Sequence, residues 1–197
     1  FAPATDIPVP VDYVIGPGDT ILIQLYGKEN ASYELAVNRE GVIQLPSIGP
    51  VVVAGLGFDE MKNYLNDLVS KQLIGVTANI TMGVLRSIRV FVLGEANRPG
   101  AYTVSSLSTM TNALFVSGGV SKLGSLRDIQ LKRNGEIQTR LDLYDLLLKG
   151  DISRDTRLMP GDVIFIPPIG KTAGISGEVL RPAIYELRNE TQIEELI

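Results

Sequence analysis

Two stretches of the chain repeat one set of residues that could do chemistry. Residues 94–104 read GEANRPGAYTV and residues 177–187 read GEVLRPAIYEL, at a constant offset of 83 positions (from 94 to 177). The shared polar and aromatic side chains are Glu95, Arg98 and Tyr102 in the first copy and Glu178, Arg181 and Tyr185 in the second. A tyrosine ring can stack on the face of a sugar while arginine and glutamate hydrogen-bond its hydroxyl groups. Both copies are therefore candidate glycan-contact sites.

The same residues have a structural interpretation. Glu95 and Arg98 are spaced to pair across the turn before Pro99, and Tyr102 is placed to pack in a sheet. An exposed ion pair of this kind contributes little to stability. The sequence leaves both interpretations open.

A second repeat joins a turn to a strand. Residues 16–27 (GPGDTILIQLYG) resemble residues 159–170 (MPGDVIFIPPIG). Proline suits the first corner of a type II turn and glycine the positive φ of the second, and the aspartate that follows can accept backbone N–H bonds. The pattern predicts two structural turns, with a ligand contact as the alternative. Their residues are Pro17, Gly18, Asp19, Pro160, Gly161 and Asp162.

The chain lacks two residue types that often act as nucleophiles and bases in catalysis. The chain has no cysteine and no histidine, which excludes disulfides, thiolate metal sites and Ser-His-Asp relays. Two of Asp142, Asp145, Asp151 and Asp155 could pose as the acid pair of a glycosidase, but Asp142 is typical of a helix cap and the others are typical of a solvated surface. We therefore predict no catalytic residue, no metal and no cofactor.

Charge is uneven along the chain, whose net charge is −4. Residues 1–85 hold 4 basic and 9 acidic groups, residues 86–170 hold 11 and 8, and residues 171–197 hold 3 and 5. An acidic chain without a basic run predicts no nucleic-acid partner. Opposite charges could pack head to tail between subunits, or they could simply be solvated. No apolar run approaches the roughly 18 residues of a membrane-spanning helix.

Periodicity predicts an α+β fold with small mixed or antiparallel sheets and three short helices, over 57–73, 108–119 and 142–150. In the first helix, an apolar stripe that includes Tyr64 is expected to face the core. Ser108 and Asp142 are the expected N-caps of the other two helices. Strands are expected over 20–26, 33–38, 41–46, 76–82, 88–94, 101–104, 129–143 and 163–166. Asn134-Gly135 predicts a two-residue hairpin turn.

The repeats also predict the domain organisation. We expect an extension over 1–12, one module over 13–85, a second over 86–170, and the truncated start of a third over 171–197. After the repeated phrase, Ile193, Leu196 and Ile197 take the places of Met110, Ala113 and Leu114. An incomplete module cannot bury its own core, so residues 171–197 should lean on the rest of the chain or on another molecule.

An ordered set of motifs resembles a known family. YVIGPGDTILIQLYG (13–27) and LAVNREGVIQLPSIGPVVVAGLGFDEM (35–61) are similar to the polysaccharide-export domain of bacterial outer-membrane polysaccharide exporters. VFVLGEANRPGAYTV (90–104) and TNALFVSGGV (111–120) resemble the SLBB β-grasp domain that follows it. The resemblance covers residues 13–197 and is strongest to members that export group-2-type capsules and carry several β-grasp modules in tandem.

The resemblance implies a non-enzymatic protein of the periplasm, associated with the outer membrane. It implies a homo-oligomeric ring that conducts capsule or exopolysaccharide, with the polysaccharide and an inner-membrane polysaccharide co-polymerase or other export machinery as partners. Two alternatives remain: a soluble module that binds a glycan or small ligand without forming a pore, and a structural periplasmic adaptor.

Overall fold

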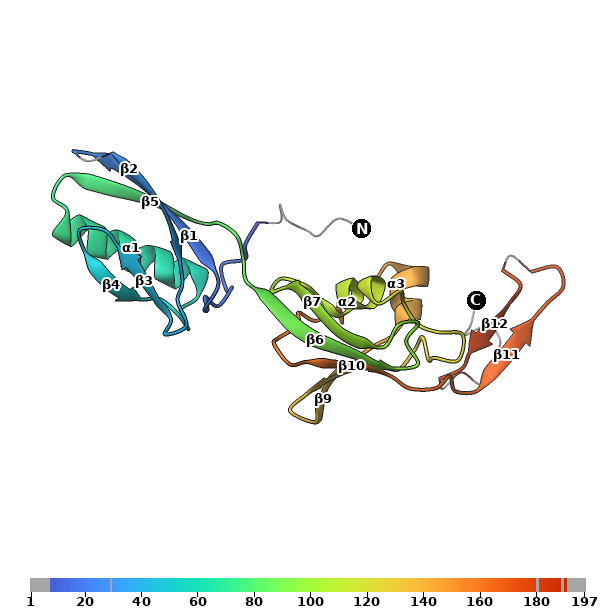
Figure 1. Cartoon of the computed structure of the whole chain (residues 1–197). Helices are drawn as coiled ribbons and strands as arrows, with labels where there is room; N and C mark the ends of the chain where they lie inside the picture. Colours follow the sequence, from blue (N-terminus) through green and yellow to red (C-terminus); the bar gives the residue numbers. More distant parts are fainter. Residues whose placement is uncertain (1–7, 29, 180, 189, 191–197) are drawn as a thin grey trace. The chain divides into compact units, whose positions relative to one another are not determined.

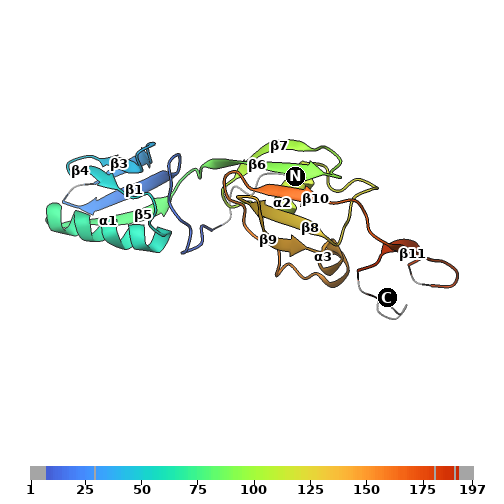
Figure 2. The same ribbon diagram turned by 90° about the horizontal axis from the view of Figure 1, so that it is seen from below.

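The computed structural model describes residues 8–28, 30–179, 181–188 and 190 of the chain. It divides into two compact units, residues 2–87 and residues 88–197 (Figures 1 and 2). The expectations for residues 1–7 and for Ile193, Leu196 and Ile197 lie outside the described residues. Each unit is described by itself.

The first unit is built around a three-stranded antiparallel sheet of order β2-β1-β5. Its elements are β1 (Thr20–Gly27), β2 (Ala31–Ala36), β3 (Val42–Leu45), β4 (Gly49–Val52), α1 (Phe58–Gln72) and β5 (Val76–Met82). In β1, Ile21, Ile23 and Leu25 are buried while Gln24 and Tyr26 are exposed, as the two-residue period of a strand requires. Helix α1 packs against β5, and β3 and β4 form a separate hairpin.

Helix α1 follows the predicted stripe except at Tyr64. Met61, Leu65 and Val69, spaced four residues apart, are buried with at most 1% of their surface exposed. Tyr64 is 44% exposed, so its predicted place in the core is wrong. At about 100° per residue, position 64 falls at the margin of the stripe centred on Leu65, where the ring turns to solvent.

The second unit contains a five-stranded mixed sheet of order β7-β6-β10-β8-β9. Strand β10 pairs parallel with β6 and antiparallel with β8. Figure 1 shows α2 and α3 on one side of this sheet, and Met110, Ala113 and Leu114 of α2 are buried in its core. The elements are β6 (Ser87–Gly94), β7 (Gly100–Ser105), α2 (Met110–Val116), β8 (Ile129–Arg133), β9 (Glu136–Leu141), α3 (Leu143–Lys149) and β10 (Val163–Ile166).

Helix α2 (Met110–Val116) is shorter than the predicted 108–119, whereas both caps of α3 are as predicted. The N-cap of α2 is Thr109, one residue after the predicted Ser108, because the Asn112 side chain accepts the Thr109 N–H at 2.9 Å. Helix α3 begins as predicted, with the Asp142 carboxylate accepting the Tyr144 N–H at 2.9 Å, and ends at Gly150 with φ of 70°.

A hairpin of β11 (Thr172–Ile175) and β12 (Ala183–Glu186) follows the five-stranded sheet. At the offset of 83 positions it corresponds to β6 and β7. The predicted α+β fold of small mixed and antiparallel sheets with three short helices is confirmed. No helix within the described ranges combines the length and apolar character needed to cross a membrane.

Candidate functional site

Each Glu-Arg-Tyr set lies within its own hairpin, and the same hydrogen bond is formed in both copies. The Tyr102 hydroxyl donates to the Arg98 carbonyl, and the Tyr185 hydroxyl donates to the Arg181 carbonyl at 2.8 Å. Tyr102 packs against the core of the second unit. In both copies, this bond joins the tyrosine side chain in the second strand of the hairpin to the backbone of the turn before it.

The charged members of the two sets are more open to solvent. Arg98, Arg181 and Glu178 are exposed, and Glu95 is half-buried with its carboxylate 3.4 Å from the Ser121 hydroxyl. Among the described side chains, no ion pair joins Glu95 to Arg98. Both arginine side chains are therefore open to solvent.

The first Pro-Gly-Asp turn holds a buried carboxylate. Gly18 has φ of 93°, and Asp19 is fully buried. Its oxygens accept the Tyr13 hydroxyl at 2.7 Å, the Gly16 N–H at 2.9 Å and the Arg86 N–H at 2.8 Å. The Arg86 guanidinium also pairs with Asp19. The turn is therefore bonded to the chain segment 67 residues further on.

The second Pro-Gly-Asp turn repeats the arrangement in the second unit. Gly161 has φ of 84°, and the buried Asp162 accepts the Met159 N–H at 2.8 Å. The Arg133 guanidinium donates to both oxygens of Asp162 at 2.8 Å, and this bond raises the pKa of Arg133. Both turn carboxylates are saturated by protein donors.

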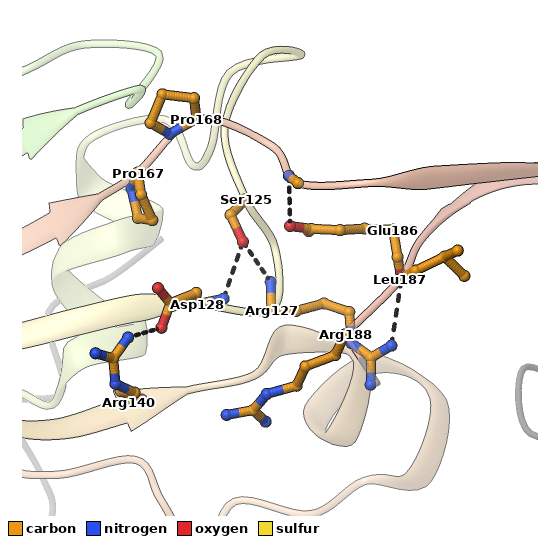
Figure 3. Close-up of a pocket in the computed structure, with 10 residues that line it drawn as sticks. Ser125, Arg127, Asp128, Arg140, Pro167, Pro168, Glu186, Leu187 and Arg188 are labelled. Carbon is orange, nitrogen blue, oxygen red and sulfur yellow. Dashed lines mark hydrogen bonds and ion pairs between the residues drawn. The ribbon is translucent and has the colours of Figure 1, made fainter. Parts of the chain in front are cut away.

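A cleft of about 390 Å³ lies within the second unit, where the β11–β12 hairpin meets the rest of that unit (Figure 3). Its walls carry both signs of charge, and Arg140 pairs with Asp128. Two other lining arginines, Arg127 and Arg188, lie 3.0 and 3.7 Å from the carboxylate of Asp142, a buried residue that does not line the cleft. The lining residues are Ser125, Arg127, Asp128, Arg140, Pro167, Pro168, Gly170, Glu186, Leu187 and Arg188.

Glu186 is the most deeply buried charged group on this cleft. It is 4% exposed, and its carboxylate accepts the Leu126 N–H at 2.8 Å and the Gly170 N–H at 3.2 Å. Its own N–H donates to the Tyr144 hydroxyl at 2.9 Å, and its carbonyl accepts from Arg127 at 3.2 Å. In Figure 3, a dashed line joins the Glu186 carboxylate to a backbone nitrogen before β11, which is the Gly170 N–H.

The Arg127 guanidinium contacts two acidic side chains and one aromatic ring. It donates to Asp142 at 3.0 Å and to Glu190 at 2.6 Å, and it lies over the Tyr144 ring, 4.9 Å from the centroid. Partial burial alone would raise the pKa of Glu190. Hydrogen bonds from the backbone N–H groups of Arg188 and Glu190 and from the Arg127 side chain outweigh this effect and lower the pKa from 4.5 to about 2. Glu190 is therefore ionised throughout the physiological range of pH.

The other three aspartates of 142–155 each bind a protein donor. Asp145 pairs with Lys149 at 2.8 Å, Asp151 accepts the Ser153 N–H at 2.8 Å, and Asp155 accepts the Thr111 N–H at 3.0 Å. The described residues contain no group of three or more acidic side chains arranged to hold a metal ion. These carboxylates act as caps and surface pairs.

The sequence did not identify the arginine and glutamate partners of these networks. Arg86, Arg127 and Arg133 lie 67, 15 and 29 residues from the aspartates they bind. Glu186 could have been noticed in the sequence because it stands in the second copy of the repeat at the position where the first copy has Thr103.

Three family models match the chain in order. "Polysaccharide biosynthesis/export protein" matches residues 7–85, and SLBB domain models match residues 88–166 and 172–197. The chain belongs to the polysaccharide-export protein family. The first unit thus contains the match to the polysaccharide-export domain, and the cleft of Figure 3 lies between the parts matched by the two SLBB models.

Relatives of this polysaccharide-export protein carry names that agree with the family. "Polysialic acid transport protein KpsD" of Escherichia coli is 31% identical over 183 residues, which are 91% of this chain and 32% of the relative. "EPS I polysaccharide export outer membrane protein EpsA" of Ralstonia solanacearum is 27% identical over 156 residues, 78% of this chain and 41% of the relative. The chain spans about a third of the length of the first of these relatives and about two fifths of the length of the second.

Proposed function

We propose that this chain is part of a non-enzymatic protein that exports capsule polysaccharide or exopolysaccharide from the periplasm through the outer membrane. The observation that supports this most is the order of the matches, a polysaccharide-export domain followed by SLBB domains, over a segment 31% identical to a polysialic acid transport protein. The saturated carboxylates fit a conduit, since a sliding hydrated polymer needs weak polar contacts and no activated acid.

We further propose that the full-length protein forms a homo-oligomeric ring and works with an inner-membrane polysaccharide co-polymerase or other export machinery. Small modules with limited cores gain stability by packing against neighbours. In this assembly, the residues of 13–85, 86–170 and 171–197 act as successive wall segments, the first formed by a polysaccharide-export domain and the others by SLBB domains.

Deletion and complementation in the native host test the proposal. We expect deletion of the gene to leave polymer inside the cell and the full-length protein to restore surface polymer, with rings visible in negative-stain images of the purified protein. A monomer that binds glycan would favour the soluble-module alternative. Unchanged surface polymer in the deletion strain would contradict an export role.

The exposed arginines of the two repeats are proposed to contact the polymer, with Glu95, Glu178 and the rings of Tyr102 and Tyr185 completing each site. The double variant Arg98→Ala/Arg181→Ala should lower surface polymer at least about 5-fold, because each of the two lost hydrogen bonds weakens polymer binding by roughly 0.5 to 1.5 kcal/mol. Export is measured as surface polymer per cell.

Arg154→Ala is the matched control, since Arg154 is an exposed arginine outside both repeats. It should leave export unchanged, and all three substitutions should leave the melting temperature within about 2 °C of the parent because surface changes cost little. Full export by a stable Arg98→Ala/Arg181→Ala protein would remove the glycan-contact assignment without touching the export role.

A further inference from the structure

The β11–β12 hairpin copies the β6–β7 hairpin in its internal bonds. In both copies a tyrosine hydroxyl donates to the carbonyl of the arginine four residues earlier. The next position in the strand differs: the first copy has Thr103, which is exposed, and the second has Glu186, which is buried. The hairpin itself therefore does not require a glutamate at this position.

The bonds of the Glu186 carboxylate point away from its own hairpin. One oxygen accepts the N–H of Leu126, which belongs to the preceding SLBB match, and the other accepts the N–H of Gly170, in the connection between the two matches. Burial of a carboxylate is unfavourable unless hydrogen bonds replace its water. The partners that offset this burial lie outside the β11–β12 strands.

Tyr144 and Arg127, both in the preceding SLBB match, also bind β12. The Tyr144 hydroxyl accepts the Glu186 N–H, and the Tyr144 ring meets Tyr185 edge to face at 6.4 Å and 85°. Arg127 donates to the Glu186 carbonyl and to Glu190, so it binds residues on both sides of Leu187. Two side chains of the preceding SLBB match, Arg127 and Tyr144, thus bind β12 and the residues that follow it.

We propose that Glu186, Arg127 and Tyr144 form an interdomain lock that fixes the orientation of the second SLBB domain on the first. The occupant of this surface is the next SLBB domain of the same chain. Thr103 does not form an equivalent lock, because its side chain is exposed. The lock makes the two SLBB domains one rigid body whether or not the protein exports polymer.

Spin-label distances in the full-length protein test the lock. Residues 1–197 contain no cysteine, so Gln138→Cys and Ser176→Cys, both at exposed positions, give one label on each domain once any cysteine outside these residues is replaced by serine. We expect a single narrow distance distribution in the parent. Glu186→Thr, which installs the residue of the first copy, should at least double its width, and Glu178→Thr, an exposed glutamate of the same hairpin, should leave it narrow.

Amide hydrogen exchange supplies a second readout if Glu186→Thr unfolds the protein. Glu186→Gln keeps the side-chain volume and one acceptor oxygen, and it should speed exchange of the Leu126 and Gly170 amides at least 10-fold while the β8 amides stay protected. A broad distribution in the parent, a narrow one in a folded Glu186→Thr protein, or unchanged exchange in Glu186→Gln would overturn the lock.

Discussion

Substitution of Asp19 by alanine should destabilise the first unit by about 3 to 5 kcal/mol, the usual cost of removing one partner of a buried ion pair. The change removes the acceptor of three donors, the Tyr13 hydroxyl and the N–H groups of Gly16 and Arg86. It also leaves the Arg86 guanidinium, 23% exposed, without its carboxylate. Such a loss is a large part of the 5 to 15 kcal/mol that holds a typical domain folded.

The free energy of unfolding is best followed in the full-length protein by hydrogen exchange of the β1 amides across a urea series. Asp67→Ala is the control, because Asp67 forms an exposed pair with Lys71 on α1, 58% and 71% exposed, and such pairs contribute about 0.2 to 1 kcal/mol. Asp19→Asn keeps the shape and one acceptor and should fall between them. If Asp19→Ala cost no more than Asp67→Ala, the buried network would not stabilise this unit.

Local patterns in the sequence were sufficient for most elements. The alternation in β1, the caps of α3 and the Asn134-Gly135 turn depend on neighbouring residues, and the structure has each, with φ of 52° and 85° at the turn. Short-range hydrogen bonds and the alternation of side chains along a strand decide these features, so the neighbouring residues contain all the information required.

Strands β4, β11 and β12 are not among the predicted strands, because their pairing depends on a partner strand. Pro50 within β4 argues against a strand, since proline cannot donate to a ladder, yet β4 pairs only with β3 and tolerates it at this edge. Residues 172–175 read TAGI, which has weak strand character, and β12 supplies their ladder. Tertiary pairing overrides local preference in both.

The partners in the charged networks could not be predicted from the sequence, for a different reason. A Pro-Gly-Asp motif predicts that the aspartate will bond to its own turn, and Asp19 and Asp162 do so. Which arginine approaches each carboxylate depends on how distant segments return to the turn, and no spacing in the sequence specifies that. The same holds for Glu186, whose partners come from 60 and 16 residues away.

Gly94→Ala should be the most damaging change within the repeated phrase, lowering the stability of the second unit by about 2 to 5 kcal/mol. Gly94 has φ of 81°, a conformation that costs alanine about 1 to 2 kcal/mol. A Cβ added there would lie 2.1 Å from the Ile166 carbonyl oxygen and 3.2 Å from the Phe165 ring. Relief of this overlap requires β10 to shift away from β6, which adds about 1 to 3 kcal/mol.

Gly177 is the same residue of the second copy and provides the matched control. It also has positive φ, 104°, but an added Cβ meets no atom of the described chain within 4 Å. Gly177→Ala should therefore cost only the backbone strain, about 1 to 2 kcal/mol, and hydrogen exchange of the β6 and β10 amides in the full-length protein should change far less than in Gly94→Ala. Equal effects would mean that φ alone accounts for both glycines. A larger effect at Gly94 would show that its glycine is required by the parallel pairing of β6 with β10, a contact that the described part of the second copy does not have.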